Sequence, residues 1–458
     1  MITPLESRIL DRNSECLGVS VSTLMENAGR CLADYVRDHS EGRVLFICGS
    51  GNNGGDGYSA YLHMKDVADI CAFREPKSEL CKAVSKDIRT IPFGDADISK
   101  YGTIVDCVLG TGPSGTLKQD YLDYIKKVNG SGKRIISCDV PTGFGTDEQV
   151  HPYATVTFHD RKEGMDEKNC GIIEVCDIGI PKEASDIINK GDFLRYPVPK
   201  KDSHKGQNGR LVIVGGGPYI GAPIMAALSS LRAGTDLVTV MTPKSSFVPI
   251  AAHSPAYMVR CLSGDVLSPD DVPEIAAVCA KADAVLIGPG LGTAEDTAKA
   301  VRALISEIEV PMIIDADGIT CLKGNVPDNC SITFTPHSRE LSSLIGKDDP
   351  SDKDVLDFCK RKGCVILRKG PVDRIYSPSR MRSNRTGTPA MTAGGTGDVL
   401  AGLVAGLTAK GMAAFDAACL GAYISGAAGE LAFEKHSYGM SATDVIDSIG
   451  RVLKEGLE

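Results

Sequence analysis

The chain contains 458 residues, of which 42% are hydrophobic and 24% are charged. This composition suits two globular domains, each with a full hydrophobic core, and excludes a disordered polypeptide. The formal net charge of −9, without any long run of Lys or Arg, argues against binding to nucleic acid or to an anionic membrane, and it favours small-molecule partners.

The sixteen cysteines are scattered, and no two of them form a C-x-x-C pair. This usage favours reduced thiols and a cytoplasmic location. The first ten residues, MITPLESRIL, include Glu6 and Arg8 where a signal peptide would need an unbroken apolar core. The most apolar region, residues 399–433, is interrupted by charged residues, so no stretch reaches the roughly 18–20 residues of a membrane-spanning helix. We therefore expect a soluble protein.

The hydrophobic period first predicts a helix over residues 23–35, with Thr23-x-x-Glu26 as a capping box. Short β-rich runs then alternate with helical segments, which is typical of a parallel α/β sheet. The strands expected in this half of the chain are residues 44–48, 68–73, 104–109, 134–138, 154–158 and 171–175.

A break in this pattern lies in residues 181–206, where the stretch YPVPKKDSHKG contains prolines and clustered charges. Strand–turn–helix units start again at Arg210. We therefore place a domain boundary near residue 200 and expect a second α/β domain. Its predicted strands are residues 211–214, 236–240, 284–287, 312–315, 331–334 and 364–367.

The loop GSGNNGGDGY follows the first predicted strand and formally satisfies the dinucleotide pattern G-x-G-x-x-G. A single match of this kind is weak, and a merely tight turn between strand and helix is the alternative. The loop also contains Asn52, Asn53 and Asp56, which a phosphate turn does not need, and an aspartate would repel a phosphate. These side chains indicate a site for hydroxyls, amides or a cation.

Two further strands end in the same way, in VDCVLGTGPSG with Asp106 and in SCDVPTGFGTD with Asp139. Ligands bind at the carboxyl ends of the strands of an open parallel sheet, so the three loops are expected to form one pocket. The expected polar residues of this pocket are Asn53, Asp56, Asp106, Asp139 and Thr142, whose oxygen atoms suit a hard cation.

The combination of LMENAGR, GNNGGDGY, LGTGPSG and DVPTG resembles the epimerase domain of the bifunctional NAD(P)H-hydrate repair enzymes, over residues 1–200. The resemblance implies a Rossmann-like three-layer sandwich that interconverts the R and S forms of NADHX and NADPHX. It also implies a potassium ion held by Asn53, Asp106 and Thr142, although Thr142 stands where the family has a serine. Asp139 is the candidate proton shuttle, and a turn cap is its structural alternative. The implied substrate contacts are Asn52, Asn53, Gly54, Gly55, Asp56, Gly110, Thr111, Gly112, Pro113, Ser114, Gly115, Thr116 and Asp139.

The strongest local signal of the second half is MTAGGTGDVLAGLVAGL, residues 391–407, in which glycines open a long helix. Bare backbone N–H groups at a helix N-terminus bind anions. A carboxylate there, Asp398, is unfavourable unless it takes the proton from a hydroxyl that attacks a phosphoryl group. The chain has no Walker sequence, which excludes a P-loop, and the G-T-G-D arrangement resembles ribokinase-type kinases. An ordinary helix start is the structural alternative.

With HKGQNG, GPGLG, TPHSREL and LRKGPVD, this motif resembles the ADP- or ATP-dependent NAD(P)H-hydrate dehydratase domain, over residues 204–458. The resemblance implies a ribokinase-like three-layer sandwich that phosphorylates the C6 hydroxyl of the S hydrate, with Asp398 as the base, and then eliminates phosphate. His337 has helix capping as its structural alternative. The implied substrate contacts are Ala222, Gly292, His337 and Asp398, and the implied nucleotide contacts are Lys369, Gly370, Pro371, Val372, Asp373 and Gly397.

Magnesium is expected with the nucleotide, because Asp315 and Asp317 at a strand end can hold Mg²⁺ through water. Their run, DADGI, departs from the family pattern, which leaves their roles open. A homo-oligomer is expected. Two other functions stay open: a ribokinase-like kinase for a small molecule, which would release a stable phosphorylated product, and an N-terminal half that serves only as a binding scaffold.

Overall fold

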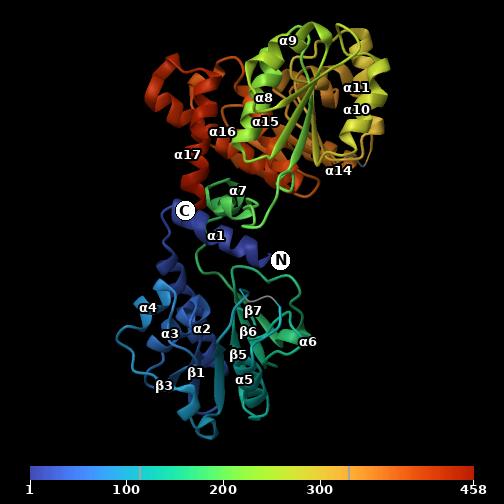
Figure 1. Ribbon diagram of the computed structural model, residues 1–458. Helices are drawn as coiled ribbons and strands as arrows, with labels where there is room; N and C mark the ends of the chain where they lie inside the picture. The colour runs from blue at the N-terminus through green and yellow to red at the C-terminus, as the bar shows by residue number, and fades with distance from the viewer. Residues whose placement is uncertain (113–114, 329–330) are drawn as a thin grey trace. The chain divides into compact units, whose positions relative to one another are not determined.

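The computed structural model describes residues 1–112, 115–328 and 331–458. The chain divides into two compact units, residues 1–184 and residues 185–458. Each unit contains one sheet with helices on both of its faces (Figure 1), which confirms the predicted pair of α/β domains.

The sheet of the first unit has seven parallel strands in the order β3-β2-β1-β4-β5-β6-β7. The strand order reverses between β1 and β4, so the loops that follow these strands diverge and open a crevice at their carboxyl ends. The strands are β1 Val44–Cys48, β2 Ala68–Ala72, β3 Ile91–Pro92, β4 Thr103–Cys107, β5 Arg134–Cys138, β6 Ala154–Phe158 and β7 Ile172–Cys176.

Helices cover both faces of this sheet because successive side chains of each strand alternate between the faces. Phe46 and Cys48 of β1 belong to the core beneath α2 (Val21–His39) and α3 (Asn52–Leu62), whereas Leu45 and Ile47 belong to the core beneath α5 (Gln119–Asn129). The other helices are α1 Pro4–Cys16, α4 Glu79–Ser85, α6 Glu167–Cys170 and α7 Glu183–Asp186, the last of which spans the division between the units.

The start of the chain differs from the sequence-based prediction. The hydroxyl of Ser20, not that of Thr23, caps α2, because Ser20 keeps an extended backbone and accepts from Thr23 N–H at 3.1 Å. The predicted cap at Thr23 is therefore wrong. Helix α1 was not predicted; it begins after Thr3 with a capping box closed by Glu6.

The sheet of the second unit has nine strands in the order β10-β9-β8-β11-β12-β13-β14-β15-β16. It is parallel from β10 to β14 and ends in an antiparallel hairpin, β15 and β16, which was not predicted. The strand order reverses between β8 and β11, which again opens a crevice at the carboxyl ends. The strands are β8 Arg210–Val214, β9 Leu237–Thr242, β10 Met258–Cys261, β11 Ala284–Ile287, β12 Met312–Ile314, β13 Ile332–Phe334, β14 Val365–Arg368, β15 Asp373–Tyr376 and β16 Met381–Asn384.

Two helical layers enclose this second sheet (Figure 1). Leu211 and Ile213 of β8 share a core with the first layer, and Val212 and Val214 share a core with the second. The first layer contains α8 Gly221–Arg232, α15 Thr396–Ala409, α16 Ala414–His436 and α17 Ala442–Leu457, and the second contains α10 Val272–Cys279, α11 Glu295–Glu307, α13 Ser338–Ile345 and α14 Asp352–Lys362. The remaining helices are α9 Lys244–His253 and α12 Asp317–Leu322.

Residues 185–196 belong to the second unit, although the sequence assigns them to the first domain. Phe193 is buried in the second unit's core. Asp192 forms an ion pair with Arg382 in which both side chains are buried. The compact division therefore falls at residues 184 and 185, before the break in composition near residue 200.

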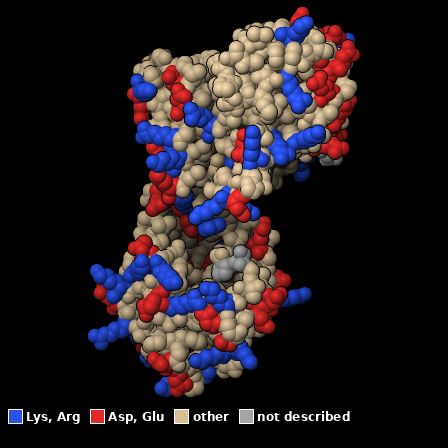
Figure 2. All heavy atoms as spheres, in the orientation of Figure 1, with Lys and Arg blue, Asp and Glu red and all other residues tan. Residues whose placement is uncertain are grey.

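Figure 2 shows Lys and Arg side chains interspersed with Asp and Glu side chains over one face of each unit. The acidic surplus is therefore not gathered into one patch on that face. Within the described ranges, no helix combines the length and apolar character needed to cross a membrane.

Candidate active sites

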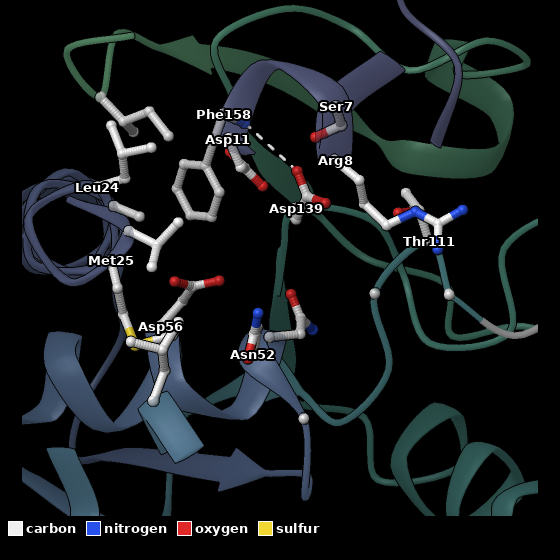
Figure 3. Close-up of a pocket in the computed structure, with 18 of the residues that line it drawn as sticks. Ser7, Arg8, Asp11, Leu24, Met25, Asn52, Asp56, Thr111, Asp139 and Phe158 are labelled. Atoms are coloured by element: carbon white, nitrogen blue, oxygen red, sulfur yellow. Dashed lines mark hydrogen bonds between the residues drawn. The ribbon is translucent and has the colours of Figure 1, made fainter. Parts of the chain in front are cut away.

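A cavity of about 420 Å³ opens at the carboxyl ends of the strands of the first sheet. Its walls come from α1, α2, the first turn of α3 and the loops after β4, β5 and β6. Figure 3 shows the carboxyl groups of Asp11, Asp56 and Asp139 converging on it from three different segments. This is the crevice where open α/β sheets bind their ligands.

Asp139 follows β5 directly and has a left-handed backbone, with φ of 62°. A residue other than glycine rarely adopts this conformation, and it is strained unless the surroundings fix it. The Asp139 N–H donates to Val156 O at 2.8 Å, which ties the turn to β6. The strained turn directs the carboxylate into the cavity.

Lys162 holds the Asp139 carboxylate, with 2.6 Å between Nζ and Oδ1. The lysine side chain is only 1% exposed, and its ammonium also donates to the Thr157 hydroxyl and the Phe158 carbonyl, both at 2.9 Å. A buried ammonium is stable only with such a full set of acceptors. Lys162 was not predicted as a site residue, because a single lysine in a loop resembles an ordinary surface residue.

Two other carboxyl groups of the cavity have raised pKa values. Burial, followed by the nearby charge of Asp139, raises the pKa of Asp11 to about 6, although Lys162 opposes the shift. Burial, then Asp139 and Asp11, raise the pKa of Asp56 well above its ordinary value. Three carboxyl groups thus meet the cationic side chains of Lys162 and Arg8 at the cavity, and burial raises the pKa of two of these carboxyl groups.

The glycine loop after β1 allows α3 to begin very close to the sheet. A Cβ at Gly54 would lie 2.1 Å from the Gly49 carbonyl oxygen, so only glycine fits there. The first turn of α3 then presents Asn52, Asn53 and Asp56 to the cavity. Of the predicted substrate contacts, those that line the cavity are Asn52, Asn53, Asp56, Gly110, Thr111, Gly112 and Asp139.

The other predicted contacts of this site lie elsewhere. Gly54 and Gly55 are buried in α3 behind the cavity wall. Gly115 and Thr116 are described but do not line the cavity. Pro113 and Ser114 lie outside the described residues.

Asp106 and Thr142 are fully buried and do not line the cavity, in contrast to the expected common pocket. The Asp106 side chain points from β4 to the face of the sheet covered by α5, where Tyr124 donates to it at 2.8 Å. Ser137 Oγ, Thr142 N–H and Thr142 Oγ1 donate to the same carboxylate at 3.1, 2.8 and 2.7 Å. Burial raises the pKa of Asp106, and these hydrogen bonds oppose the shift.

The side-chain amide of Asn53 is buried, and neither its oxygen nor its nitrogen has a hydrogen-bond partner in the described part of the chain. Buried polar atoms are nearly always paired, so this amide oxygen is a candidate ligand for a cation. Within the described residues, no group of three His, Cys, Asp or Glu side chains could hold a metal ion. A cation here would therefore take most of its ligands from amide, hydroxyl or carbonyl oxygens.

The second candidate site lies at the carboxyl ends of β12, β13 and β14, beside the start of α15. Lys369, directly after β14, forms an ion pair with Asp315, directly after β12, with 2.9 Å between Nζ and Oδ1. The hydroxyl of Thr335, directly after β13, donates to the same oxygen at 2.7 Å. Parallel strands thus bring three polar residues together that are far apart in sequence.

Asp398 lies in the first turn of α15 and faces this group. Burial, followed by the charge of Asp315, raises the pKa of Asp398 to about 7, with Lys369 opposing and Asp317 assisting the shift. Burial lowers the pKa of Lys369, but Asp315, Glu340 and Asp398 raise it by more, so the ammonium stays charged. A carboxyl group poised near neutral pH suits a general base.

Gly395 makes the approach to α15 possible, because it caps the helix with a left-handed φ of 95°. A Cβ at Gly397 would lie 3.5 Å from Lys369 Nζ, so two predicted nucleotide contacts are neighbours. A third, Asp373, is fixed by the N–H of Gly370 at 3.1 Å and the amide of Asn384 at 3.2 Å.

The predicted substrate contacts of the second unit lie in different local environments. His337 caps α13, where Nδ1 accepts from the N–H groups of Arg339 and Glu340, each at 3.2 Å, so its structural alternative holds. Gly292 donates its N–H to Asp317 at 2.8 Å, which fixes the carboxylate of Asp317. Ala222 lies partly exposed in the first turn of α8.

Two family models match the chain. The model described as YjeF-related protein N-terminus matches residues 21–164, and the model described as NAD(P)H-hydrate dehydratase matches residues 211–451. Each match falls within one of the two compact units. A solved structure of a ribokinase-like superfamily protein from Enterococcus faecalis matches 59% of this chain and 96% of its own, with a TM-score of 0.53 and 26% identity. This confirms the ribokinase-like fold.

Relatives are similar over the whole chain. The bifunctional NAD(P)H-hydrate repair enzyme Nnr of Methanothermobacter thermautotrophicus is 36% identical over 502 residues, which cover 100% of this chain and 96% of the relative. The protein of the same name from Archaeoglobus fulgidus is 36% identical over 466 residues, which cover 98% of this chain and 97% of the relative. The alternative of a small-molecule kinase is thus not favoured. The chain belongs to the family of bifunctional NAD(P)H-hydrate repair enzymes, as its motifs predict.

Proposed function

We propose that the cavity of the first unit interconverts the R and S forms of NADHX and NADPHX, and that the Asp398 site of the second unit dehydrates the S form. The observation that carries the proposal is the convergence of carboxyl groups with raised pKa values on a cavity of about 420 Å³, within the range of small-molecule sites. Inversion at a carbon bearing a hydroxyl and a ring nitrogen needs ring opening, or loss and return of hydroxide. Both routes need proton transfer.

In the first site, Asp139 exchanges a proton with the hydrate, and Lys162 fixes its position. The first turn of α3 and the loop after β4 hold the substrate through amide, hydroxyl and backbone groups. The residues proposed for this contact are those of the predicted set that line the cavity, namely Asn52, Asn53, Asp56, Gly110, Thr111 and Gly112.

A potassium ion fits beside this cavity. Within the described residues, Asn53 offers an unpaired amide oxygen, and the hydrogen bonds to the buried Asp106 carboxylate come from neutral donors. With the hydroxyl of Thr142, the set supplies hard oxygen ligands and one negative charge, which suits a monovalent cation. The bound ion would neutralise Asp106 and fix the turn that carries Asn53.

In the second site, Asp398 removes the proton of the C6 hydroxyl, whose oxygen attacks the terminal phosphoryl group of ADP or ATP. The shortened nucleotide leaves, and loss of phosphate from C6 with a proton from C5 then restores the dihydronicotinamide ring. Ala222, Gly292 and His337 are the other proposed substrate contacts. The nucleotide is proposed to contact residues 369–373 and Gly397. Magnesium fits near Asp315 and Asp317, because several carboxyl groups surround the single ammonium of Lys369.

One assay tests both halves of the proposal. The purified full chain is given a mixture of R and S hydrates, with ADP, with ATP or without nucleotide, and the absorbance of the restored dihydronicotinamide is followed. With a nucleotide, the whole mixture is expected to be consumed, and without one the epimers should interconvert but persist. Consumption of the S form alone would contradict the epimerase role, and a stable phosphorylated product would indicate a kinase.

Two further expectations accompany this function. The cysteines that the structure describes are all free thiols, which supports a cytoplasmic location. We also propose that the protein is a homo-oligomer. Light scattering of the purified protein tests the second expectation.

A further inference from the structure

Helix α1 contributes one wall of the cavity in the first unit. Ser7, Arg8 and Asp11 line the cavity, whereas Ile9 and Leu10 on the other side of the helix are buried. Ser7 and Asp11 are one helical turn apart and therefore share a face. All three residues precede residue 21, where the first family match begins.

The start of the chain is bound to the segment that carries Lys162. Ile2 forms a parallel β-bridge with Lys162, in which Ile2 N–H donates to Arg161 O at 2.9 Å and Glu163 N–H donates to Ile2 O at 3.0 Å. The far end of α1 is held by Asn13, whose buried amide donates to the Ala184 carbonyl at 3.1 Å. Asp11 is therefore fixed relative to Lys162 and the Asp139 carboxylate that Lys162 holds.

Asp11 and Asp139 face the same space but have different partners. Lys162 pairs with Asp139, and the Thr157 hydroxyl also donates to Asp139 at 3.3 Å. Lys162 and Asp139 act on Asp11 only through their charges, and Figure 3 shows the Asp11 carboxyl beside Asp139 at the cavity. Asp139 is thus a carboxylate fixed by an ammonium, and Asp11 is a carboxyl group that faces the cavity from α1.

We propose that Asp11 is a second proton-transfer group of this cavity, which gives a proton to the ring nitrogen of the hydrated nicotinamide while Asp139 takes one from its C6 hydroxyl. This proposal rests on the epimerase function proposed above. The proposal gives α1 a role in catalysis. Ring opening needs one group to accept the hydroxyl proton and another to supply a proton to N1, and an ionised Asp139 has no proton to supply.

The atoms and electrons of the step balance. Asp139 removes the hydroxyl proton, the C6–N1 bond breaks as the C6=O double bond forms, and N1 keeps the electron pair and takes the proton of Asp11. Rotation about C5–C6 turns the other face of the carbonyl carbon toward N1. In the reverse step N1 bonds to C6 and returns its proton to Asp11, while the oxygen recovers its proton from Asp139. Nothing is oxidised or reduced.

The protonation of Asp11 fits this task. Burial and the charge of Asp139 raise the pKa of Asp11 to about 6, so both of its forms are populated near neutral pH. The other charged groups at the cavity are Lys162, Asp56 and Arg8 of the same helix. Burial, followed by the charges of Asp139 and Asp11, raises the pKa of Asp56 well above its ordinary value.

The test compares the full-length wild type with Asp11→Asn, Asp11→Glu and Glu15→Gln, the last being an exposed acid on the same helix. Interconversion of the hydrates is measured without nucleotide, by separating the epimers, from pH 5 to 8. We expect Asp11→Asn to lower kcat by about 10²–10⁴-fold with little change in KM, Asp11→Glu to recover part of it, and Glu15→Gln to match the wild type. The wild-type rate should fall as the pH rises above about 6, and this limb should be absent in Asp11→Asn.

Thermal unfolding of the variants separates chemistry from folding. Asp11→Asn should unfold at or above the wild-type temperature at pH 7, because it removes a carboxyl group whose ionisation is unfavourable in the fold. An Asp11→Asn variant that keeps the wild-type kcat and pH profile, or changes only KM, would contradict the role of Asp11 and leave the proposed epimerase function unaffected. A wild type that does not interconvert the epimers would contradict the proposed function itself.

Discussion

The ammonium of Lys162 lies 2.6 Å from the carboxylate of Asp139, and the lysine is almost completely buried. Removing one member of a buried ion pair leaves an unpaired charge and typically costs ~3–5 kcal/mol, more than the pair itself contributes. This pair connects the strained turn after β5 with the loop after β6. Catalysis and the stability of the first unit are therefore coupled through it.

Replacing Lys162 with methionine should destabilise the first unit by ~3 kcal/mol and reduce epimerisation strongly, because Asp139 loses its anchor. Lys168→Met, which changes an exposed lysine of α6, is the matched control and should do neither. Thermal unfolding and separation of the epimers are the measurements. Equal stability of Lys162→Met and the wild type would contradict the importance of the pair.

Asp398→Asn should abolish nucleotide-dependent dehydration and leave epimerisation intact, because the two sites lie in different units. Loss of a general base typically costs about 10²–10⁴-fold in rate. The control is Asp447→Asn, an exposed acid of α17. Dehydration of pure S hydrate with ADP or ATP is measured, and a rate near that of the wild type would refute the assignment.

The rate of dehydration should rise with pH through about 7, because Asp398 must lose its proton to act as a base. The stability that Asp398 contributes to the fold changes with pH in the opposite direction. The pKa of Asp398 is raised from 3.8 to about 7 in the fold, so the stability it contributes is complete below pH 3.8 and is lost as the pH rises to about 7. Asp398→Asn should therefore stabilise the second unit at pH 8 more than at pH 5, as denaturant titrations can measure.

Epimerisation should require potassium. We expect Asn53→Ala to raise the potassium concentration needed for half-maximal rate, because it removes a ligand without breaking any protein hydrogen bond in the described structure. Asp106→Asn should abolish the response, since it removes the only negative charge of the proposed ligand set. Rates are measured across a potassium titration in which sodium keeps the ionic strength constant. A wild type indifferent to potassium would exclude the cation.

A fragment of residues 185–458 should fold and dehydrate S hydrate, whereas a fragment of residues 204–458 should be less stable. The shorter fragment lacks Phe193 in the core and Asp192 beside the buried guanidinium of Arg382. Leaving this arginine unpaired should cost ~3–5 kcal/mol. Urea unfolding of the two fragments decides the point. Equal stability would show that the boundary expected from composition near residue 200 is equally good.

The sequence by itself determined the two α/β domains and most of their strands, because each buried parallel strand is a short apolar run bounded by turn residues. The strands predicted at residues 44–48, 134–138, 154–158 and 284–287 are reproduced residue for residue. Edge strands such as β3 and β10 were missed, since runs of two and four residues do not stand out in the sequence. The glycine loops, Asp139 and Asp398 could also be singled out from the sequence. Asp139 directly follows an apolar strand, and Asp398 lies in the first turn of a helix that glycines open.

Only the tertiary structure decided which distant residues share a site. Lys162, Asp11 and Asp139 meet through the bridge between Ile2 and Lys162 and through the turn after β5, neither of which has a local signature. It also separated Asp106 from the cavity, because a strand residue's face depends on its register in the sheet. The protonation of Asp11 and Asp398 was decided in the same way, since burial and the charges of sequence-distant neighbours, not residue type, set the pKa of a carboxyl group.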